Sequence, residues 1–263
     1  MPEGHIARKR FGQNFLHDRN IIGKIVAAIA PKAGETVVEI GPGLGALTQP
    51  LLAASGHLHV VEIDRDLIAR LKETYAPTQL SIHEGDALKF DFGTLPTPLR
   101  VVGNLPYNIS TPLLFHLAKY AEQVRDMTFM LQKEVVQRMV AEPDTEEFGR
   151  LSVMLQYRFS MARLFDVPPG AFNPAPKVTS AIVWMQPRPV AELKCRDAEL
   201  LSRIVTAAFG QRRKTLRNTL REWLGDEDFS ALGIDAGARG EVLGVDDYVR
   251  IANHLSVRDG LER

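Results

Sequence analysis

The sequence predicts a doubly wound α/β domain followed by a small helical domain. Short apolar runs alternate with amphipathic runs through the first two-thirds of the chain, a glycine-rich segment follows the first of these apolar runs, and the chain beyond about Asp197 has helical periodicity. Apolar residues make up 45% of the 263 residues, which is enough for a sizeable core. The expected parallel strands are TVVEI (36–40), LHVVEI (58–63), QLSIH (79–83), LRVVG (99–103) and MTFML (127–131).

Each of these runs is short, apolar and bounded by turn residues, as is typical of buried parallel strands. The intervening segments 47–54 and 66–75 have helical periodicity, which indicates βαβ units with right-handed crossovers. A further helix is expected over 131–141. Two more strands, 158–167 and 178–187, are joined by VPPGAFNPAPK without a helix, which favours an antiparallel hairpin at the edge of an otherwise parallel, seven-stranded sheet.

The prolines of MQPRPVAELK mark an expected domain boundary, giving domains over 1–190 and 191–263. Beyond it, 199–209 and 211–224 are predicted helices. In the second of these, helical spacing would place basic side chains on one stripe and leucines on another that faces a core. The basic stripe comprises Arg213, Arg217 and Arg221, and the leucine stripe Leu216, Leu220 and Leu224.

The single cysteine, Cys195, excludes an internal disulfide and a cysteine-based zinc cluster, and it favours a reducing compartment. The N-terminal segment lacks the apolar core of a secretory signal, and no apolar run approaches the roughly 20 residues of a membrane-spanning helix. We therefore expect a cytoplasmic protein without a membrane partner or a bound metal. Nothing resembles a dedicated subunit interface, so a monomer is expected.

The formal charge is balanced, with 32 basic and 32 acidic residues, but the charges are segregated along the chain. Basic residues gather near the N-terminus and again in 203–221, whereas acidic residues crowd the final stretch. Such a basic run is either a solvated helix face or a surface that binds nucleic-acid phosphates. The candidate RNA-binding residues are Lys9, Arg10, Arg213, Lys214, Arg217 and Arg221.

The loop GPGLGA follows the strand TVVEI, where glycines allow the backbone to approach a ligand closely. With Gly41, Gly43 and Ala46 it satisfies the dinucleotide fingerprint, in which pyrophosphate binds at the N-terminus of a helix. With Glu39 and Gly45 included, it is equally similar to the first motif of S-adenosylmethionine-dependent methyltransferases.

Polar residues after three further strands favour the methyltransferase interpretation. Glu62 ends the second strand, where a carboxylate can accept hydrogen bonds from two ribose hydroxyls, and either cofactor would use this contact. Asp86, after the third strand, offers a carboxylate to an adenine amino group. The segment NLPY, after the fourth strand, has no obvious use in a dehydrogenase.

The segment NLPY suits an exocyclic amine such as adenine N6, whose lone pair is delocalised into the ring. Two acceptors that hold its N–H groups, the Asn104 side-chain oxygen and the Leu105 carbonyl, would favour tetrahedral geometry. Pro106 restricts Leu105 to an extended conformation and so aims that carbonyl. Tyr107 supplies a ring for base stacking, worth about 1–3 kcal/mol. The sulfonium donor is already activated, so we expect alignment to carry most of the rate and assign no general base.

The sequence resembles the ribosomal RNA adenine N6,N6-dimethyltransferases, and specifically the small-subunit dimethyladenosine transferases, over nearly its whole length. The motifs that carry the resemblance are colinear with the family: RKRFGQNFL, VEIGPGLGALT, VVEIDRDL, GDAL, GNLPYNISTPLLFHL, FMLQKEVVQRM, GRLSVMLQY, VPPGAFNPAPKVTSA and FGQRRKTLRNTL. The resemblance implies a Rossmann-like S-adenosylmethionine methyltransferase domain and a helical RNA-binding domain. It also implies the transfer of four methyl groups to two adjacent adenosines in the hairpin loop near the 3′ end of 16S rRNA.

The resemblance further implies roles for individual residues. Asn14 and Leu16 would close over the cofactor, and Phe172 would share base stacking with Tyr107, although a phenylalanine in such a turn also suits a core. The partner would be a pre-30S particle in ribosome biogenesis. The remaining cofactor contacts would come from Gly41, Glu62, Asp86 and Asn104.

Four alternatives remain at this point. DNA or protein N-methyltransferases commonly carry proline in place of Leu105, and the large-subunit rRNA dimethylases share the NLPY-type segment. A non-catalytic ribosome assembly factor would keep the motifs as relics. A nicotinamide-dependent dehydrogenase would rest on the glycine loop alone.

Overall fold

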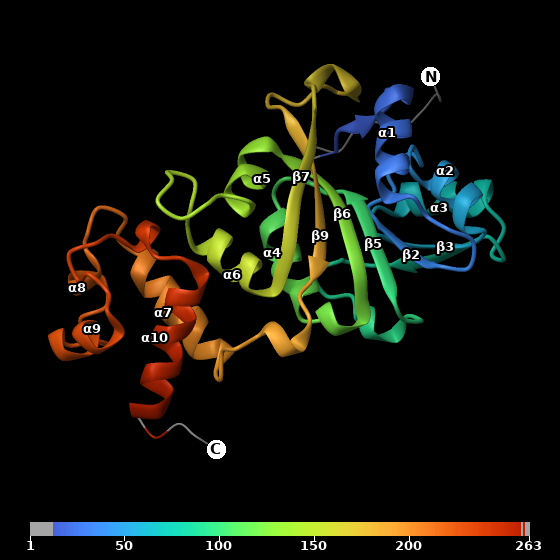
Figure 1. Cartoon of the computed structure of the whole chain (residues 1–263). Coiled ribbons are helices and arrows are strands. Elements are labelled where there is room, and N and C mark those ends of the chain that lie inside the picture. The colour runs from blue at the N-terminus through green and yellow to red at the C-terminus, as the bar shows by residue number, and fades with distance from the viewer. Residues whose placement is uncertain (1–12, 259, 261–263) are drawn as a thin grey trace. The chain divides into compact units, whose positions relative to one another are not determined.

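The main sheet of the computed structural model, which describes residues 13–258 and 260, has seven strands in the order β4-β3-β2-β5-β6-β9-β7 (Figure 1). The pairs β4–β3, β3–β2, β2–β5 and β5–β6 are parallel. The strands are β2 (Thr36–Ile40), β3 (Leu58–Glu62), β4 (Leu80–Glu84), β5 (Leu99–Asn104), β6 (Val124–Gln132), β7 (Phe159–Val167) and β9 (Ser180–Pro187). The predicted parallel α/β fold is therefore confirmed.

Strand order places the helices on both faces of the sheet. From β2 the chain steps outward through β3 to β4, returns to β5 on the other side of β2, and continues to β6. Right-handed crossovers then place α2 and α3 on one face and α4 on the other. Their bounds are α2 (Thr48–Ser55), α3 (Arg65–Thr74) and α4 (Ser110–Ala118), and α1 (Arg19–Ile29) precedes β2.

The far edge of the sheet contains the expected antiparallel element. Strand β9 pairs antiparallel with β6, and β7 lies beside β9 at the edge. The connection from β7 to β9 contains β8 (Phe172–Asn173), which pairs antiparallel with β1 (Phe15–Leu16) in a separate two-stranded sheet. This small sheet brings the motif QNFL next to the motif GAFNP.

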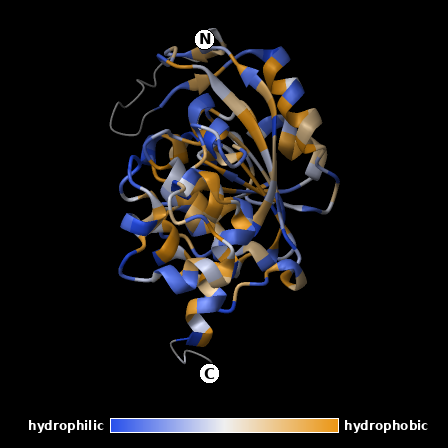
Figure 2. Cartoon of the chain, turned by 60° about the vertical axis from the view of Figure 1, so that its left-hand side comes forward, coloured by the Kyte–Doolittle hydropathy of each residue, from blue (hydrophilic) through white to orange (hydrophobic). Residues whose placement is uncertain are grey.

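The chain divides into two compact units, one formed by residues up to Val136 with Met161–Pro187 and the other by Gln137–Ser160 with residues from Arg188 onward. The last boundary between the units, at Pro187–Arg188, lies close to the predicted domain boundary at 190. The sequence did not indicate that residues 137–160 belong with the C-terminal helices. The reason is packing, since Phe148 and Val153 are buried in the same apolar cluster as Leu201 and Tyr248. Helix α5 (Lys133–Met139) spans the boundary between the two units. The helices of the second unit are α6 (Arg150–Arg158), α7 (Ala198–Phe209), α8 (Leu216–Thr219), α9 (Asp226–Leu232) and α10 (Val245–Arg258). In Figure 2 the helix that runs to the marked C-terminus carries both hydrophobic and hydrophilic residues, as a helix with one face on a core does.

The prediction of one continuous helix over 211–224 is wrong, because only α8 is helical there. The backbone N–H of Leu216 donates to the carbonyl of Ala238 at 2.8 Å, and that of Arg217 to the carbonyl of Ala236 at 2.9 Å. These amides are therefore paired across to a neighbouring segment rather than within a helix. The leucine side of the prediction is nevertheless borne out, since Leu216, Leu220 and Leu224 are all buried in the C-terminal core.

Candidate functional site

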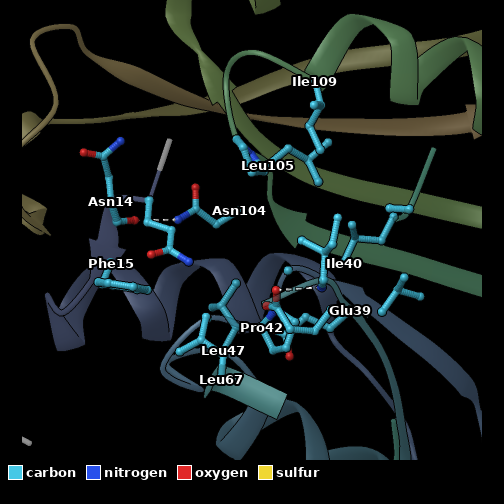
Figure 3. Close-up of a pocket in the computed structure, with 18 of the residues that line it drawn as sticks. Asn14, Phe15, Glu39, Ile40, Pro42, Leu47, Leu67, Asn104, Leu105 and Ile109 are labelled. Atoms are coloured by element: carbon cyan, nitrogen blue, oxygen red, sulfur yellow. Dashed lines mark hydrogen bonds between the residues drawn. The ribbon is translucent and has the colours of Figure 1, made fainter. Parts of the chain in front are cut away.

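A cavity lies at the carboxyl ends of four adjacent parallel strands (Figure 3). In a parallel sheet these ends meet at one edge, and open α/β sheets bind their ligands there. The predicted cofactor residues lie in or next to five different strands, β1 to β5, yet the structure brings all of them to the lining of this one cavity. These residues are Asn14, Leu16, Gly41, Glu62, Asp86 and Asn104.

The glycine loop after β2 forms the floor of the cavity. Gly41, Gly43 and Gly45 have φ values of 64°, 59° and 87°, in the left-handed region that side chains disfavour. The ring of Phe15 lies 3.3 Å from the position that a Cβ on Gly43 would occupy, so glycine there also leaves room for the segment containing β1. The backbone N–H of Gly41 donates to the carbonyl of Val61 at 2.9 Å, which joins the loop to the end of β3.

Glu62 ends β3, and its carboxylate is held by the backbone that follows it. Its Oε1 accepts hydrogen bonds from the N–H groups of Ile63 and Asp64, both at 2.9 Å. Burial raises the pKa of Glu62, whereas these two N–H groups and that of Gly43 act in the opposite direction. Glu62 is 6% exposed but lines the cavity, so its second oxygen can accept hydrogen bonds from the hydroxyls of a ligand bound there.

Asp86 follows β4 and lines the cavity with Gly85 and Leu88. Its Oδ1 accepts from the backbone N–H of Leu88 at 2.9 Å, which fixes the side chain within its own turn. The carboxylate can therefore present its other oxygen to a ligand donor. Glu62 and Asp86 thus offer acceptors on neighbouring strands, as expected for a nucleoside.

Glu39 also lines the cavity, although it was not among the predicted contacts. It is 2% exposed, and its Oε2 accepts a hydrogen bond from the Thr48 hydroxyl at 2.6 Å. Burial raises the pKa of Glu39 to about 7; the Thr48 hydrogen bond opposes this rise and the Glu62 charge adds to it. A signal was present in the sequence, because Glu39 precedes the glycine loop in the motif already quoted.

Asn104 ends β5 and points toward Asn14 (Figure 3). Its Nδ2 donates to the main-chain carbonyl of Asn14 at 3.1 Å. A carbonyl oxygen can only accept, so the atom of Asn104 that contacts it must be the amide nitrogen. This contact therefore fixes the orientation of the amide and places Oδ1 on the opposite side. Within residues 13–258 no donor contacts Oδ1, which therefore remains available as an acceptor.

The residues after Asn104 hold a second acceptor at the mouth of the cavity. Leu105 is 1% exposed, and its N–H donates to the carbonyl of Met130 at 3.1 Å. No N–H of the described chain donates to the Leu105 carbonyl, so it is free to accept. Pro106 lines the cavity, and its carbonyl accepts from Ile109 at 3.2 Å as the chain turns into α4.

Tyr107 lines the same cavity and is partly buried. Its hydroxyl lies 2.7 Å from the hydroxyl of Ser180, a fully buried residue at the start of β9. Burial raises the pKa of Tyr107, and the hydrogen bond with Ser180 opposes the rise. Sequence reasoning missed Ser180, even though it lies within the quoted motif VPPGAFNPAPKVTSA.

Phe172 is not brought to the cavity lining. It is 3% exposed and pairs in register with Leu16, and both belong to the same apolar cluster. In this conformation the ring is a core side chain of that cluster. Its predicted part in base stacking remains a prediction.

The candidate RNA-binding residues fall into three groups. Lys9 and Arg10 lie outside the described residues. Arg217 forms an ion pair with Asp226 at 2.7 Å. Arg213, Lys214 and Arg221 are exposed, and none of them forms an ion pair with any residue of the described chain. They lie outside α8, so the predicted stripe on one helix does not exist.

Gly103 is a further residue that the sequence did not single out. A Cβ at this position would lie 2.6 Å from the carbonyl oxygen of Ile40, which is far inside van der Waals contact. Glycine therefore allows β5 to approach β2 closely, just before Asn104. Asp64 was not singled out either. Its carboxylate accepts hydrogen bonds from Gln13 Nε2 at 3.0 Å and from the backbone N–H of Asp66 at 3.1 Å.

Comparison with known proteins identifies the family of this chain. The family model described as ribosomal RNA adenine dimethylase matches residues 4–256. This chain belongs to that family. Among its relatives, the Ribosomal RNA small subunit methyltransferase A of Aromatoleum aromaticum is 74% identical over 97% of this chain and 96% of its own length. The protein of the same description from Dechloromonas aromatica is 62% identical over 97% of this chain and its full length.

Solved structures agree with this assignment. A dimethyladenosine transferase from Plasmodium falciparum is 25% identical, with a TM-score of 0.80 over 94% of this chain and 98% of its own. The 23S rRNA methyltransferase ErmE is also 25% identical, with a TM-score of 0.72 over 92% of this chain and all of its own. The chain is therefore an S-adenosylmethionine-dependent rRNA adenine dimethyltransferase. The dehydrogenase alternative is excluded by this assignment.

Among the described residues no group of three or more histidine, cysteine, aspartate or glutamate side chains is arranged to hold a metal ion. No helix in the described part of the chain is both long and apolar enough to cross a membrane.

Proposed function

We propose that this enzyme dimethylates N6 of two adjacent adenosines in the 3′-terminal hairpin loop of 16S rRNA, within a pre-30S particle. The choice of the small subunit is supported by the relatives of 62–74% identity, which are described as small-subunit methyltransferases. The enzyme would act as a monomer in the cytoplasm, during small-subunit assembly.

The observation that carries the proposal is the pair of free acceptors at the cavity mouth. Asn104 Oδ1 is left open because Nδ2 is bound to the Asn14 carbonyl, and the adjacent Leu105 carbonyl has no donor among the described residues. An adenine N6 amine has two N–H groups, so it can satisfy both acceptors at once. Tyr107, next along the chain, would stack on the ring of the same base.

The cofactor would bind across the strand ends behind these acceptors. Glu62 would hold the ribose hydroxyls and Asp86 the adenine amino group, while Asn14, Leu16 and Gly41 would enclose the remainder. When bound, S-adenosylmethionine supplies the activated methyl group. The chain's own residues then position the N6 lone pair, and they exclude water with the apolar wall of the cavity.

The RNA would be held by basic residues of the C-terminal unit. Arg213, Lys214 and Arg221 are exposed and form no ion pair with a described residue, so they can contact phosphates directly. Arg217, predicted as a further contact, would first have to leave Asp226. A base in a hairpin loop is already unstacked or cheaply flipped, which suits an enzyme that grips it by the exocyclic amine.

The decisive experiment is to incubate the protein with labelled S-adenosylmethionine and undermethylated small subunits, and then to map the modified nucleotides. Dimethyladenosine at two adjacent positions of the 3′-terminal loop is expected. Asn104→Ala should abolish methylation but leave binding to the particle nearly intact, whereas Asn20→Ala, an exposed asparagine of α1 outside the cavity, should change neither. Equal losses of binding and turnover in Asn104→Ala would contradict the role of Asn104.

The large-subunit alternative is tested by the same experiment. It is favoured only by the structural likeness to ErmE, at 25% identity. Label in 23S rRNA and none in 16S rRNA would establish it and reject the proposal.

A further inference from the structure

We propose that Glu39 makes the cavity distinguish the sulfonium methyl donor from its uncharged thioether product, so that spent product is exchanged for fresh donor between methyl transfers. The inference rests on the proposed function, because it assigns S-adenosylmethionine to this cavity. In each transfer the N6–CH₃ bond forms as the S–CH₃ bond breaks and a proton leaves N6. The sulfur thereby loses its positive charge, and the ligand changes from net +1 to neutral.

Among the residues that the structure describes, the charged side chains that line the cavity are all acidic. Three carboxyl side chains, Glu39, Glu62 and Asp86, contribute to the lining, and no lysine, arginine or histidine is found among the described lining residues. Such a cavity attracts a cation more strongly than a neutral molecule of the same shape. Donor and product differ by one methyl group and one charge, so charge is the larger available difference.

Glu39 is distinguished from the other two by its surroundings. Thr48 of α2 donates to Oε2, and within residues 13–258 no donor contacts Oε1. Glu62 of β3 acts on it as a like charge. Tyr75, the residue directly after α3, is also influenced by Glu39, since burial and the charge of Glu39 raise the pKa of its hydroxyl. None of these neighbours is a cation, so no residue of the described chain neutralises the negative charge of Glu39.

A bound sulfonium would supply the missing positive charge. The ordinary effect of burial is to favour the neutral acid, and the pKa of Glu39 at about 7 means that both forms are populated near neutral pH. Donor binding favours the carboxylate and releases a proton, whereas the thioether has no charge that would do so. Glu62 would hold the same ribose in both ligands, so its titration cancels when the two affinities are compared.

The test is calorimetric titration of the full chain with S-adenosylmethionine and with S-adenosylhomocysteine between about pH 6 and about pH 7.5. The ratio of donor to product affinity should rise by about fivefold over this range, as part of a total effect of about tenfold for two unit charges about 10 Å apart at an effective dielectric constant of about 20. Repeating the titration in buffers of different ionisation enthalpy should show that more protons are released on binding of the donor than on binding of the product.

Two variants and one control separate Glu39 from the rest of the cavity. Glu39→Gln keeps the shape and an acceptor for Thr48, and it should lower the ratio at about pH 7.5 by about tenfold and remove its pH dependence. Thr48→Val removes the hydrogen bond that lowers the pKa of Glu39, so the rise in the ratio should move to higher pH. Glu84→Gln changes an exposed carboxyl outside the cavity that pairs with Lys72, and it should leave the ratio unchanged.

The possible failures are distinguishable. A wild-type ratio that does not vary with pH, or an unchanged ratio in Glu39→Gln, would overturn this inference while methylation of small subunits still supported the proposed function. Failure of both ligands to bind would overturn the inference and the proposed function together.

Discussion

The hydrogen bond between Tyr107 and Ser180 should be energetically coupled to the position of the Tyr107 ring. The two hydroxyl oxygens lie 2.7 Å apart, and Ser180 is 0% exposed. Tyr107→Phe keeps the ring but leaves a fully buried hydroxyl unpaired, which costs about 1–3 kcal/mol. Ser180→Ala leaves the Tyr107 hydroxyl unpaired instead. Because Tyr107 is only partly buried, water can reach it, and the cost should be about 0.5–1.5 kcal/mol.

The double variant Tyr107→Phe/Ser180→Ala contains neither hydroxyl, so it has no orphaned group. Its free energy of unfolding should therefore be lower than that of the wild type by only about 1 kcal/mol, less than the two single losses together. Urea denaturation of the four proteins measures this coupling. Additive single effects would show that the two hydroxyls do not interact in solution.

Methylation rates of the same four proteins test whether the hydrogen bond matters for function. Tyr107→Phe retains stacking and should lose less activity than Tyr107→Ala, which loses a contact worth about 1–3 kcal/mol. The double variant should recover part of the activity that Tyr107→Phe loses, because the ring regains a relaxed position. Equal activities of Tyr107→Phe and Tyr107→Ala would refute stacking and point to the hydroxyl itself.

Three further outcomes are expected. Gly103→Ala would force apart β5 and β2, displacing Asn104, so the initial rate of methylation should fall by about tenfold or more. In the cofactor-free protein the pKa of Glu39 is raised above its unfolded value, so the folded state holds a proton between about pH 4.5 and about pH 7 and this contribution to stability is lost as pH rises. The free energy of unfolding of Glu39→Gln, measured by urea denaturation relative to that of the wild type, should therefore increase by about 3 kcal/mol as the pH is raised from about 5 to about 8. Replacing Arg213 and Arg221 by alanine should reduce the slope of log RNA affinity against log salt by about 0.7 per lost phosphate contact.

Matched controls are available for these variants. Gly23→Ala lies in α1 with nothing within 4 Å of the new Cβ, and it should leave the methylation rate unchanged. Arg217→Ala should change the salt slope less than the other arginine variants, because Asp226 already pairs with Arg217. A glycine control that loses as much activity as Gly103→Ala, or a Glu39→Gln advantage that is independent of pH, would contradict the reasoning. So would a salt slope that is unaltered when Arg213 and Arg221 are removed.

Much of the fold was predictable because buried parallel strands are continuous apolar runs. TVVEI was expected at 36–40 and β2 spans the same residues, while the other six strands lie within a few residues of their predicted ranges. The motifs also predicted residues that the structure brings together in the lining of one cavity, since the strands that precede them are short and end in turn residues. Chain order alone placed Gly41, Glu62 and Asp86 at one edge once the strands were taken as parallel.

The helix expected over 211–224 shows why the remainder was not predictable. Its leucine spacing correctly identified buried positions, but the backbone amides of Leu216 and Arg217 are paired with carbonyls about 20 residues further along the chain. Local periodicity reports which side chains are apolar and contains no information on such a distant competitor. The pairing of Phe172 with Leu16, and their burial in one apolar cluster, likewise joins segments far apart in sequence.

The sequence by itself determined the parallel sheet, the edge of that sheet at which the glycine loop lies, and the family. All three follow from local patterns and from motifs of contiguous residues. Tertiary structure decided which acceptors stay open and which are satisfied. Asn104 is oriented by the Asn14 carbonyl and Tyr107 by Ser180, and among the described residues no cation lines the cavity beside Glu39. Each of these features depends on atoms brought together from separate segments of the chain. The energies of hydrogen bonds and buried charges depend on such neighbours, and a linear pattern does not specify them.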